Sequence, residues 1–118
     1  MNHNSNQQKF FQLLGLAMRA RSILTGDGTC LQAIRQGQAK AAILAEDAGP
    51  NTFKKYHDKC RSYQVPLVVM GDKDTLGQAL GKEQRAVIVV TQDGFANRLL
   101  ELARENNGGD GFDENASL

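Results

Sequence analysis

The sequence predicts an α/β fold: a three-layer α/β/α sandwich around a small, largely buried sheet that is mixed or largely parallel. Three runs of consecutive apolar residues, each of strand length, alternate with segments whose apolar residues recur at helical spacing. Continuous apolar runs are typical of strands covered on both faces. Their alternation with helices therefore predicts a sheet with helices on either side.

The first elements are read from the stretch up to Gly26. QQKFFQLLGLAMRAR carries a broad apolar stripe at helical spacing. It predicts a helix that ends near Arg21, with Ser5 or Asn6 as its cap. Residues 22–25 follow as a short strand that Gly26 closes.

The remaining elements follow from caps, glycine stops and apolar runs. Gly37 and Gly81 are expected to stop helices, Pro50 to open one, and Asp72 and Asp93 to cap two. The predicted order is helix 27–36, strand 41–45, helix 50–63, strand 66–70, helix 73–80, strand 86–90 and a last helix after Asp93.

Length and composition predict one globular domain over residues 1–105. The 118-residue chain is 41% hydrophobic and 23% charged and has no Trp. Residues 106–118 are Gly-rich, Asn-rich and acidic with few apolar side chains, so we expect a disordered tail. All 14 basic residues precede this tail and three of the 13 acids lie in it, which gives the body +4 and the tail −3. A body charge of +4 is compatible with a nucleic-acid partner but does not require one.

The two cysteines predict neither a zinc site nor a secreted protein. Cys30 lies among the apolar positions of its helix, and Cys30, His57 and Cys60 would make an incomplete ligand set. We expect Cys30 to be a buried structural residue and His57 to lie on the surface. The N-terminal MNHNSNQQKFF has no apolar core for a signal peptide or membrane span, so a cytoplasmic protein with reduced thiols is expected.

The candidate motifs for nucleotide binding and catalysis do not have the residues or the spacing that such sites need. Residues 77–83, GQALGKE, place three residues between glycines where a P-loop needs four, and Glu83 stands where Ser or Thr should bind Mg²⁺. GDGTCL at residues 26–31 has Leu31 where a dinucleotide fingerprint has its third glycine. Glu46 and Asp47 could form an acid pair, but two carboxylates after a strand more often cap or brace the next element.

The most informative stretch is GDGTCLQAIRQG, residues 26–37. A helix start framed by glycines leaves backbone N–H groups unsatisfied under little side-chain bulk, so it can receive a polyanion closely. Cations precede three of the strands and could form one cationic rim beside this helix start, each neutralising one phosphate. These cations are Arg19, Arg21, Lys40, Lys82 and Arg85. The alternative is that charges at the ends of elements are simply solvated.

Two long segments resemble a known family. TGDGTCLQAIRQGQAKAAILAEDAGPNTFKK and GDKDTLGQALGKEQRAVIVV resemble the kink-turn-binding ribosomal protein superfamily, the L7Ae/L30e-like family, and LLGLAMRARSILTG resembles its short bacterial branch. The resemblance covers about residues 10–102. It implies an α/β/α sandwich that binds sharply bent RNA with a bulge.

The resemblance also implies where RNA would bind. The loop and first turns of the second helix would enter the widened major groove, and a second loop, residues 81–86, would support the extruded nucleotide. Many members of the family carry Asn-Glu where Gly28 and Thr29 stand here, and Lys where Gln32 stands. The expected RNA-binding residues are Gly26, Asp27, Gly28, Thr29, Gln32, Arg19, Arg21, Lys40, Lys82, Gln84 and Arg85. Thr29 and Gln32 share a helix face and are expected at base edges, with the cations on phosphates.

These observations predict a non-catalytic, monomeric protein that binds structured RNA, ribosomal or other, with no cofactor, metal, membrane or small-molecule substrate. Two alternatives stay open. The first is a protein-interaction module on the same fold that has lost RNA recognition. The second is a small-molecule enzyme that uses the strand end near Glu46 and Asp47.

Overall fold

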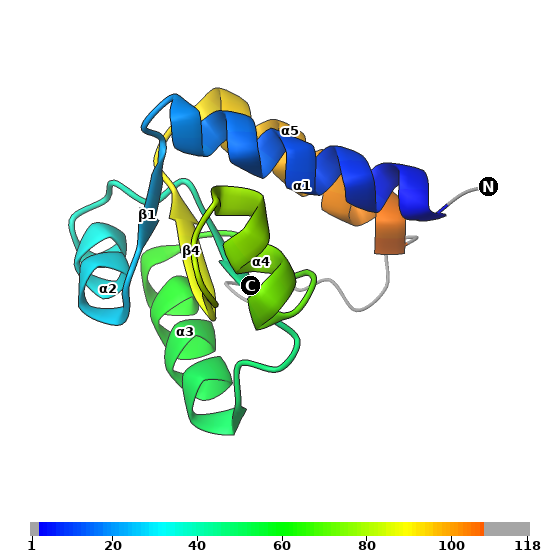
Figure 1. Cartoon of the computed structure of the whole chain (residues 1–118). Coiled ribbons are helices and arrows are strands. Elements are labelled where there is room, and N and C mark those ends of the chain that lie inside the picture. Colours follow the sequence, from blue (N-terminus) through cyan, green and yellow to red (C-terminus); the bar gives the residue numbers. More distant parts are fainter. Residues whose placement is uncertain (1–2, 108–118) are drawn as a thin grey trace.

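The computed structural model describes residues 3–107, which form five helices and four strands (Figure 1). The predicted tail, residues 106–118, lies outside the described residues from 108 onward, and its boundary is wrong by two residues because Asn106 and Asn107 belong to α5. The elements are α1 (His3–Arg19), β1 (Ile23–Thr25), α2 (Asp27–Arg35), β2 (Ala41–Leu44), α3 (Pro50–Tyr63), β3 (Leu67–Val69), α4 (Lys73–Leu80), β4 (Val87–Val90) and α5 (Asp93–Asn107).

The four strands form one mixed sheet in the order β1-β4-β2-β3. β4 is antiparallel to both of its neighbours, β1 and β2, and only the pair β2 and β3 is parallel. The prediction of a mixed sheet is confirmed, and the alternative of a largely parallel sheet is wrong. Every residue of β2 and β4 is buried, as the continuous apolar runs predicted.

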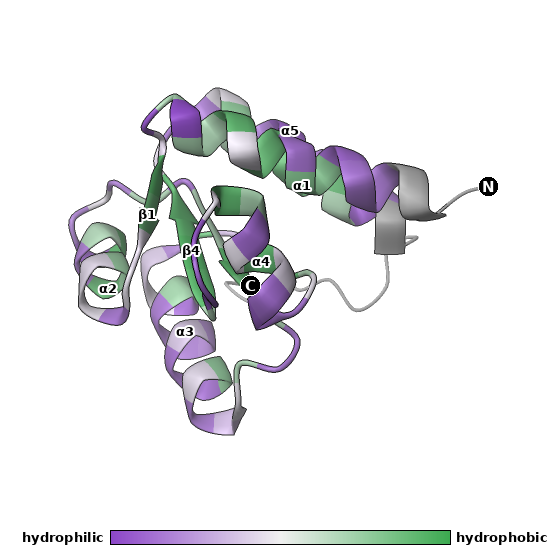
Figure 2. Cartoon of the chain, in the orientation of Figure 1, coloured by the Kyte–Doolittle hydropathy of each residue, from purple (hydrophilic) through white to green (hydrophobic). Residues whose placement is uncertain are grey.

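Helices cover both faces of the sheet. α1, α4 and α5 pack on one face in a hydrophobic cluster that includes Phe10, Leu76 and Leu99. α2 and α3 pack on the other face in a second cluster, which includes Ile34 and Tyr56. Alternate residues of β2 divide between the two clusters, as the pleat of a strand requires. Figure 2 shows the hydrophobic strands between helices with hydrophilic outer sides, so the α/β/α sandwich is confirmed.

The helix caps agree with the prediction in one case and differ in two. The Asp72 carboxylate caps α4 and accepts the Thr75 backbone N–H at 2.8 Å, as expected. α1 already begins at His3, before the predicted Ser5 or Asn6 cap, and ends at Arg19. Asp93 lies in the first turn of α5, where its negative charge still complements the helix dipole, and is not the cap.

Strand direction gives the sheet two unlike ends. β1, β2 and β3 run one way and β4 runs the other. We call the end where β1, β2 and β3 finish the lower end, and it comprises residues 26–29, 45–52, 70–73 and 84–87. The opposite, upper end comprises residues 19–22, 36–40, 64–66 and 91–94. Consequently α2, α3 and α4 all begin at the lower end, whereas α1, α2 and α3 finish at the upper end.

Candidate nucleic-acid interface

The start of α2 is exposed at the lower end. Gly26, at the N-cap, has φ 95° and ψ 135°, a conformation that favours glycine, and no side chain caps this helix start. The first hydrogen bond of the helix runs from the Cys30 N–H to the Gly26 carbonyl at 2.8 Å. A Cβ added at Gly28 would meet no atom within 4 Å. Residues 26–29 are all exposed, so a ligand can approach the amides of the first turn.

A second bare helix start lies at the same end of the sheet. α3 begins after Gly49, which has φ 97° and ψ 153° and likewise makes no side-chain cap bond. Pro50 opens this helix, as predicted. Strand direction brings the two helix starts to one end, a convergence that sequence reasoning missed. The sequence signal was the dipeptide Gly49-Pro50.

A hollow of about 550 Å³ lies between the start of α2, the first turns of α3 and the chain that leads into β4. It is lined by Thr25, Gly26, Asp27, Thr52, Lys55, Gln84, Arg85, Ala86 and Val87. The two segments that the resemblance selected, around Gly26 and around Gln84, therefore lie side by side. Thr52 and Lys55 of α3 complete the wall, and the sequence analysis did not include them.

Asp27 connects α2 to α3. Its carboxylate accepts one hydrogen bond from the Tyr56 hydroxyl at 2.8 Å and pairs with the Lys55 ammonium at 2.8 Å. The Tyr56 hydroxyl also lies 3.1 Å from the Asp27 carbonyl oxygen. Lys55 and then Tyr56 hold the pKa of the Asp27 carboxyl below its usual 3.8. Asp27, predicted as a direct RNA contact, thus has both carboxylate oxygens engaged within the protein.

The loop on the other side of the hollow is held in place by α4. The Gln84 side chain donates to the Asp74 carboxylate at 2.8 Å, and Arg85 Nη1 donates to the carbonyls of Glu83 and Gln84 at 3.2 and 2.9 Å. Gly77 allows the close approach, since a Cβ there would lie 2.1 Å from the Glu83 carbonyl oxygen. The wall of the hollow that Gln84 and Arg85 form is therefore held in one conformation by hydrogen bonds within the protein.

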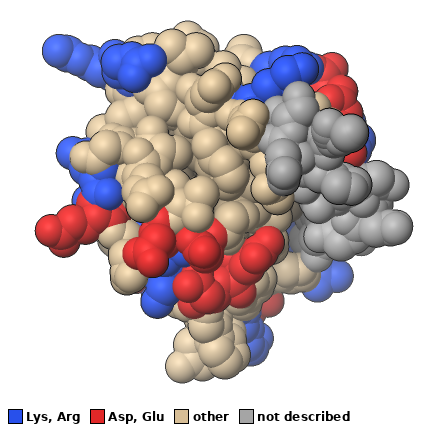
Figure 3. Space-filling model, turned by 45° about the vertical axis from the view of Figure 1, so that its right-hand side comes forward, with Lys and Arg blue, Asp and Glu red and all other residues tan. Residues whose placement is uncertain are grey.

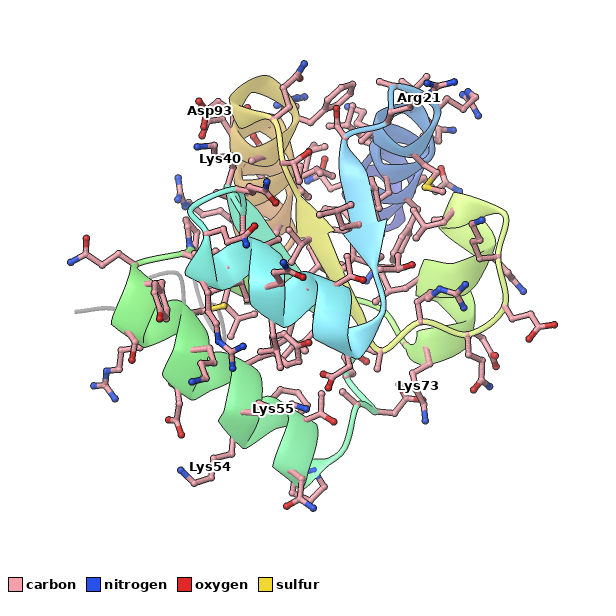
Figure 4. The ribbon with its side chains drawn as sticks, turned by 90° about the vertical axis from the view of Figure 1, so that its left-hand side faces the viewer. Arg21, Lys40, Lys54, Lys55, Lys73 and Asp93 are labelled. Carbon is pink, nitrogen blue, oxygen red and sulfur yellow. The ribbon has the colours of Figure 1, made fainter. Side chains whose placement is uncertain are left out.

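The prediction of one continuous cationic rim is wrong. Arg21 and Lys40 lie at the upper end, opposite Lys55 and Lys73, as Figure 4 shows. Arg19, in the last turn of α1, lies toward the same upper end. The rim prediction grouped cations that precede strands, but β4 is antiparallel to β1 and β2, so residues before β4 lie at the lower end. Of the predicted cations, Arg85 lines the hollow, and Lys82 lies three residues earlier in the loop between α4 and β4.

Thr29 and Gln32 are exposed on α2, one helical turn apart. Neither lines the hollow, so they lie on the surface that continues from it along the helix. Lys73, at the start of α4, is a further cation at the lower end (Figure 4) that the sequence analysis did not select.

The distribution of charged side chains favours the approach of a polyanion to the lower end from the side of α2 and α3. Figure 3 shows acidic side chains gathered on a lower part of the surface, and the exposed acids Asp72 and Asp74 belong to the start of α4. A polyanion would be repelled there. The α2 side offers bare helix amides instead.

The alternative sites receive no support from the geometry. Asp47 accepts the Lys73 backbone N–H at 2.9 Å and so braces the start of α4. Cys30 and Cys60 are buried, as expected for Cys30, and burial raises the pKa of both thiols to about 12. Within residues 3–107 no group of three or more His, Cys, Asp or Glu side chains could hold a metal ion. None of the described helices is long and apolar enough to cross a membrane.

Comparison with known proteins agrees with this fold. Residues 8–100 match the model of the ribosomal protein L7Ae/L30e/S12e/Gadd45 family. The RNA-binding protein YlxQ of Bacillus subtilis is 46% identical over 94 residues, which are 80% of this chain and 94% of that protein. YlxQ of Enterococcus faecium is 38% identical over 100 residues, which are 85% and 96% of the two chains.

Solved structures show the same architecture. A Bacillus halodurans protein of unknown function superposes with a TM-score of 0.79 at 47% identity, covering 80% of this chain and 96% of that one. The 15.5kD RNA binding protein of Giardia lamblia gives a TM-score of 0.70 at 20% identity, covering 88% and 89%, and so shares the fold. By its sequence and its architecture, this chain belongs to the ribosomal protein L7Ae/L30e/S12e/Gadd45 family.

Proposed function

We propose that this protein binds structured RNA through the lower end of the sheet, without catalysis, and that its preferred target is a kink-turn in ribosomal or another RNA. The observation that carries the proposal is the exposed, glycine-capped start of α2 beside the preset hollow. The relatives named as RNA-binding proteins support the same class of partner.

The mechanism is selection of a bent RNA shape. Backbone N–H groups at the start of α2 face outward and bind phosphate oxygens, while Thr29 and Gln32 reach base edges along the same helix face. Lys82 and Arg85 bind phosphates on the other side of the hollow. A rigid surface that fits the kinked form better than the extended form shifts the RNA population toward the kink.

The deciding experiment is a titration of a labelled kink-turn RNA and of an unkinked duplex of equal length at two salt concentrations. We expect the kink-turn to bind more tightly at both, with the preference kept as salt rises because phosphate number is matched. Equal affinity for the two RNAs, or no binding at low salt near neutral pH, would overturn the proposal.

Gln32→Lys should strengthen kink-turn binding by on the order of 1 kcal/mol, because it adds one charged hydrogen bond at the exposed face of α2. Gln36→Lys is the matched control: it adds the same charge to the exposed C-cap of the same helix, at the upper end. An equal gain from both substitutions in a short kink-turn would mean that only net charge matters.

One observation favours a second function, a protein-interaction module. Leu16 is 49% exposed and, with Leu13 and Leu102, lines a shallow hollow between α1 and α5. Co-purification with and without ribonuclease separates the two functions. A partner protein that survives digestion, and is lost in Leu16→Glu, would favour the module.

A further inference from the structure

Arg21 and Lys40 form a cationic pair at the upper end, on either side of the last residue of β4. Ile23 of β1 and Ala41 of β2 both pair with Val90. The Lys40 N–H donates to the Val90 carbonyl at 2.7 Å, and the Thr91 N–H donates to the Ser22 carbonyl at 2.9 Å. Because β4 lies between β1 and β2, two strand spacings, roughly 10 Å, separate the backbone near Arg21 from the backbone at Lys40.

The other arginines at this end have a structural explanation. Arg19, Arg35 and Arg61 lie in the last turns of α1, α2 and α3, where a positive charge stabilises the helix C-terminus. Lys40 lies outside the helices, and Arg21 lies in the turn that follows the last residue of α1. Neither makes an ion pair within 4 Å with a described acid, and Figure 4 labels an acid, Asp93, at the same end on the side of Lys40.

Arg21 also occupies a backbone position that favours glycine. Its φ is 61°, and the Arg21 and Ser22 N–H groups donate to the Met18 and Ala17 carbonyls, which closes α1 with a Schellman motif. Gln64 takes the same conformation at the end of α3 with an uncharged side chain. Arg21 can therefore be replaced by glycine without loss of the turn, and Gln64 provides the matched backbone control.

We infer that Arg21 and Lys40 form a second RNA contact, which binds backbone phosphates of a duplex stem without reading its sequence. The inference takes RNA as the partner from the proposed function but concerns a different surface. The molecule measures 37 × 29 × 27 Å, and β1 with its flanking residues, roughly 15 Å of chain, separates the two ends. Only an RNA that extends beyond the kink along the protein reaches both surfaces.

The test compares three RNAs: a kink-turn with minimal stems, the same kink-turn with one stem extended by a helical turn, and a plain duplex. For the double variant Arg21→Gly with Lys40→Gln, affinity for the extended RNA should fall about tenfold at low salt. The slope of log affinity against log salt should fall by about 2, since two phosphate contacts are lost. Binding of the minimal kink-turn should not change.

Three controls isolate the surface. Lys9→Gln removes an exposed cation roughly 15 Å along α1 from Arg19. It should change the affinities for the minimal and the extended RNA by the same factor. Gln64→Gly changes only the left-handed turn and should leave all three affinities unchanged. Asp93→Asn removes the acid at the same end and should raise affinity for the extended RNA alone.

Each outcome decides between the two surfaces. If the double variant loses no more affinity for the extended RNA than for the minimal one, the second contact is wrong. If the wild-type protein does not prefer the minimal kink-turn over duplex, the proposed recognition at the lower end fails. In that case the second contact is still tested by plain duplex: the slope of log affinity against log salt should be lower for the double variant than for wild type, and an unchanged slope overturns the contact. Failure of the wild-type protein to bind any of the three RNAs overturns both proposals.

Discussion

The two ends of the sheet offer positive charge to a ligand by different means. At the lower end, α2 and α3 begin after glycine caps without side-chain partners, so the positive character comes from backbone N–H groups. At the upper end, helices α1, α2 and α3 finish with negative carbonyl ends, and α5 begins there with an acid, Asp93, in its first turn. The positive charge that this end offers to a ligand comes from side chains, namely those of Arg21 and Lys40.

This difference separates shape recognition from charge attraction. Backbone amides and the preset wall around Arg85 are fixed in geometry, so the lower end can select one RNA shape. Arg21 and Lys40 are long side chains that can follow any phosphate backbone. We therefore expect substitutions at the lower end to change specificity and substitutions at the upper end to change salt dependence.

The largest effect is expected for Gly77→Ala, which should disrupt the loop at the lower end and leave the upper end unchanged. The new Cβ would lie 2.1 Å from the Glu83 carbonyl oxygen and 2.6 Å from its carbon, both backbone atoms, so α4 and the loop must separate. The free energy of unfolding should fall by about 2 kcal/mol, as overpacking typically costs, and kink-turn affinity should fall with it. Urea unfolding and RNA titration test this, and an unchanged midpoint would show that the loop yields freely.

Tyr56→Phe should have the next largest effect, a loss of about 1 kcal/mol in the free energy of unfolding, because Asp27 loses a hydrogen-bond donor. The start of α2 should then be less well fixed and bind RNA more weakly. Tyr63→Phe on the same helix is the control, because Tyr63 is 46% exposed and has no hydrogen bond to a described residue. Equal effects of the two variants would argue against a role for Asp27 in positioning α2.

Gly28→Ala should act in opposite directions on stability and binding. Alanine is a better helix former and no atom lies within 4 Å of the new Cβ, so the free energy of unfolding should rise by about 0.5 kcal/mol. RNA affinity should fall because the methyl group covers the helix start.

Gly94→Ala makes the same change at the second residue of α5, at the upper end, where the nearest atom is the Gln92 side-chain oxygen at 3.6 Å. It should raise stability without weakening the minimal kink-turn. A loss of affinity in both variants would contradict the assignment of the lower end as the contact surface.

The smallest effect near neutral pH is that of Asp27 protonation. Its folded pKa is lowered from 3.8, so its stabilising contribution is present above 3.8 and is lost as pH falls through the folded pKa. The difference in unfolding free energy between wild type and Asp27→Asn should be constant from about pH 8 to about pH 5 and shrink in stronger acid. A difference that changes between pH 8 and 5 would point to another group.

Local chemistry accounts for what was predicted correctly. Gly26 and Gly81 end elements as expected, and both have positive φ, which glycine adopts without a Cβ penalty. The Asp72 cap and the opening Pro50 act on the first turn of their own helices. Such signals operate over a few residues, so they can be read in order along the chain.

Partners distant in the chain could not be read in this way. Tyr56 and Lys55 meet Asp27 only because α3 packs beside α2, across nearly thirty residues of sequence. Nothing in the residues near Tyr56 distinguishes it from another buried aromatic side chain. The hollow that these contacts border is likewise a product of packing.

The sequence by itself determined the layers, the order of elements and the bare glycine-capped start of α2, because periodicity, caps and left-handed turns are local preferences of the backbone. Only the tertiary structure decided which charges share a surface. β4 inserts between β1 and β2 in the opposite direction, and strand direction depends on pairing between distant segments. This insertion places Arg21 and Lys40 at one end and Gly26 and Arg85 at the other.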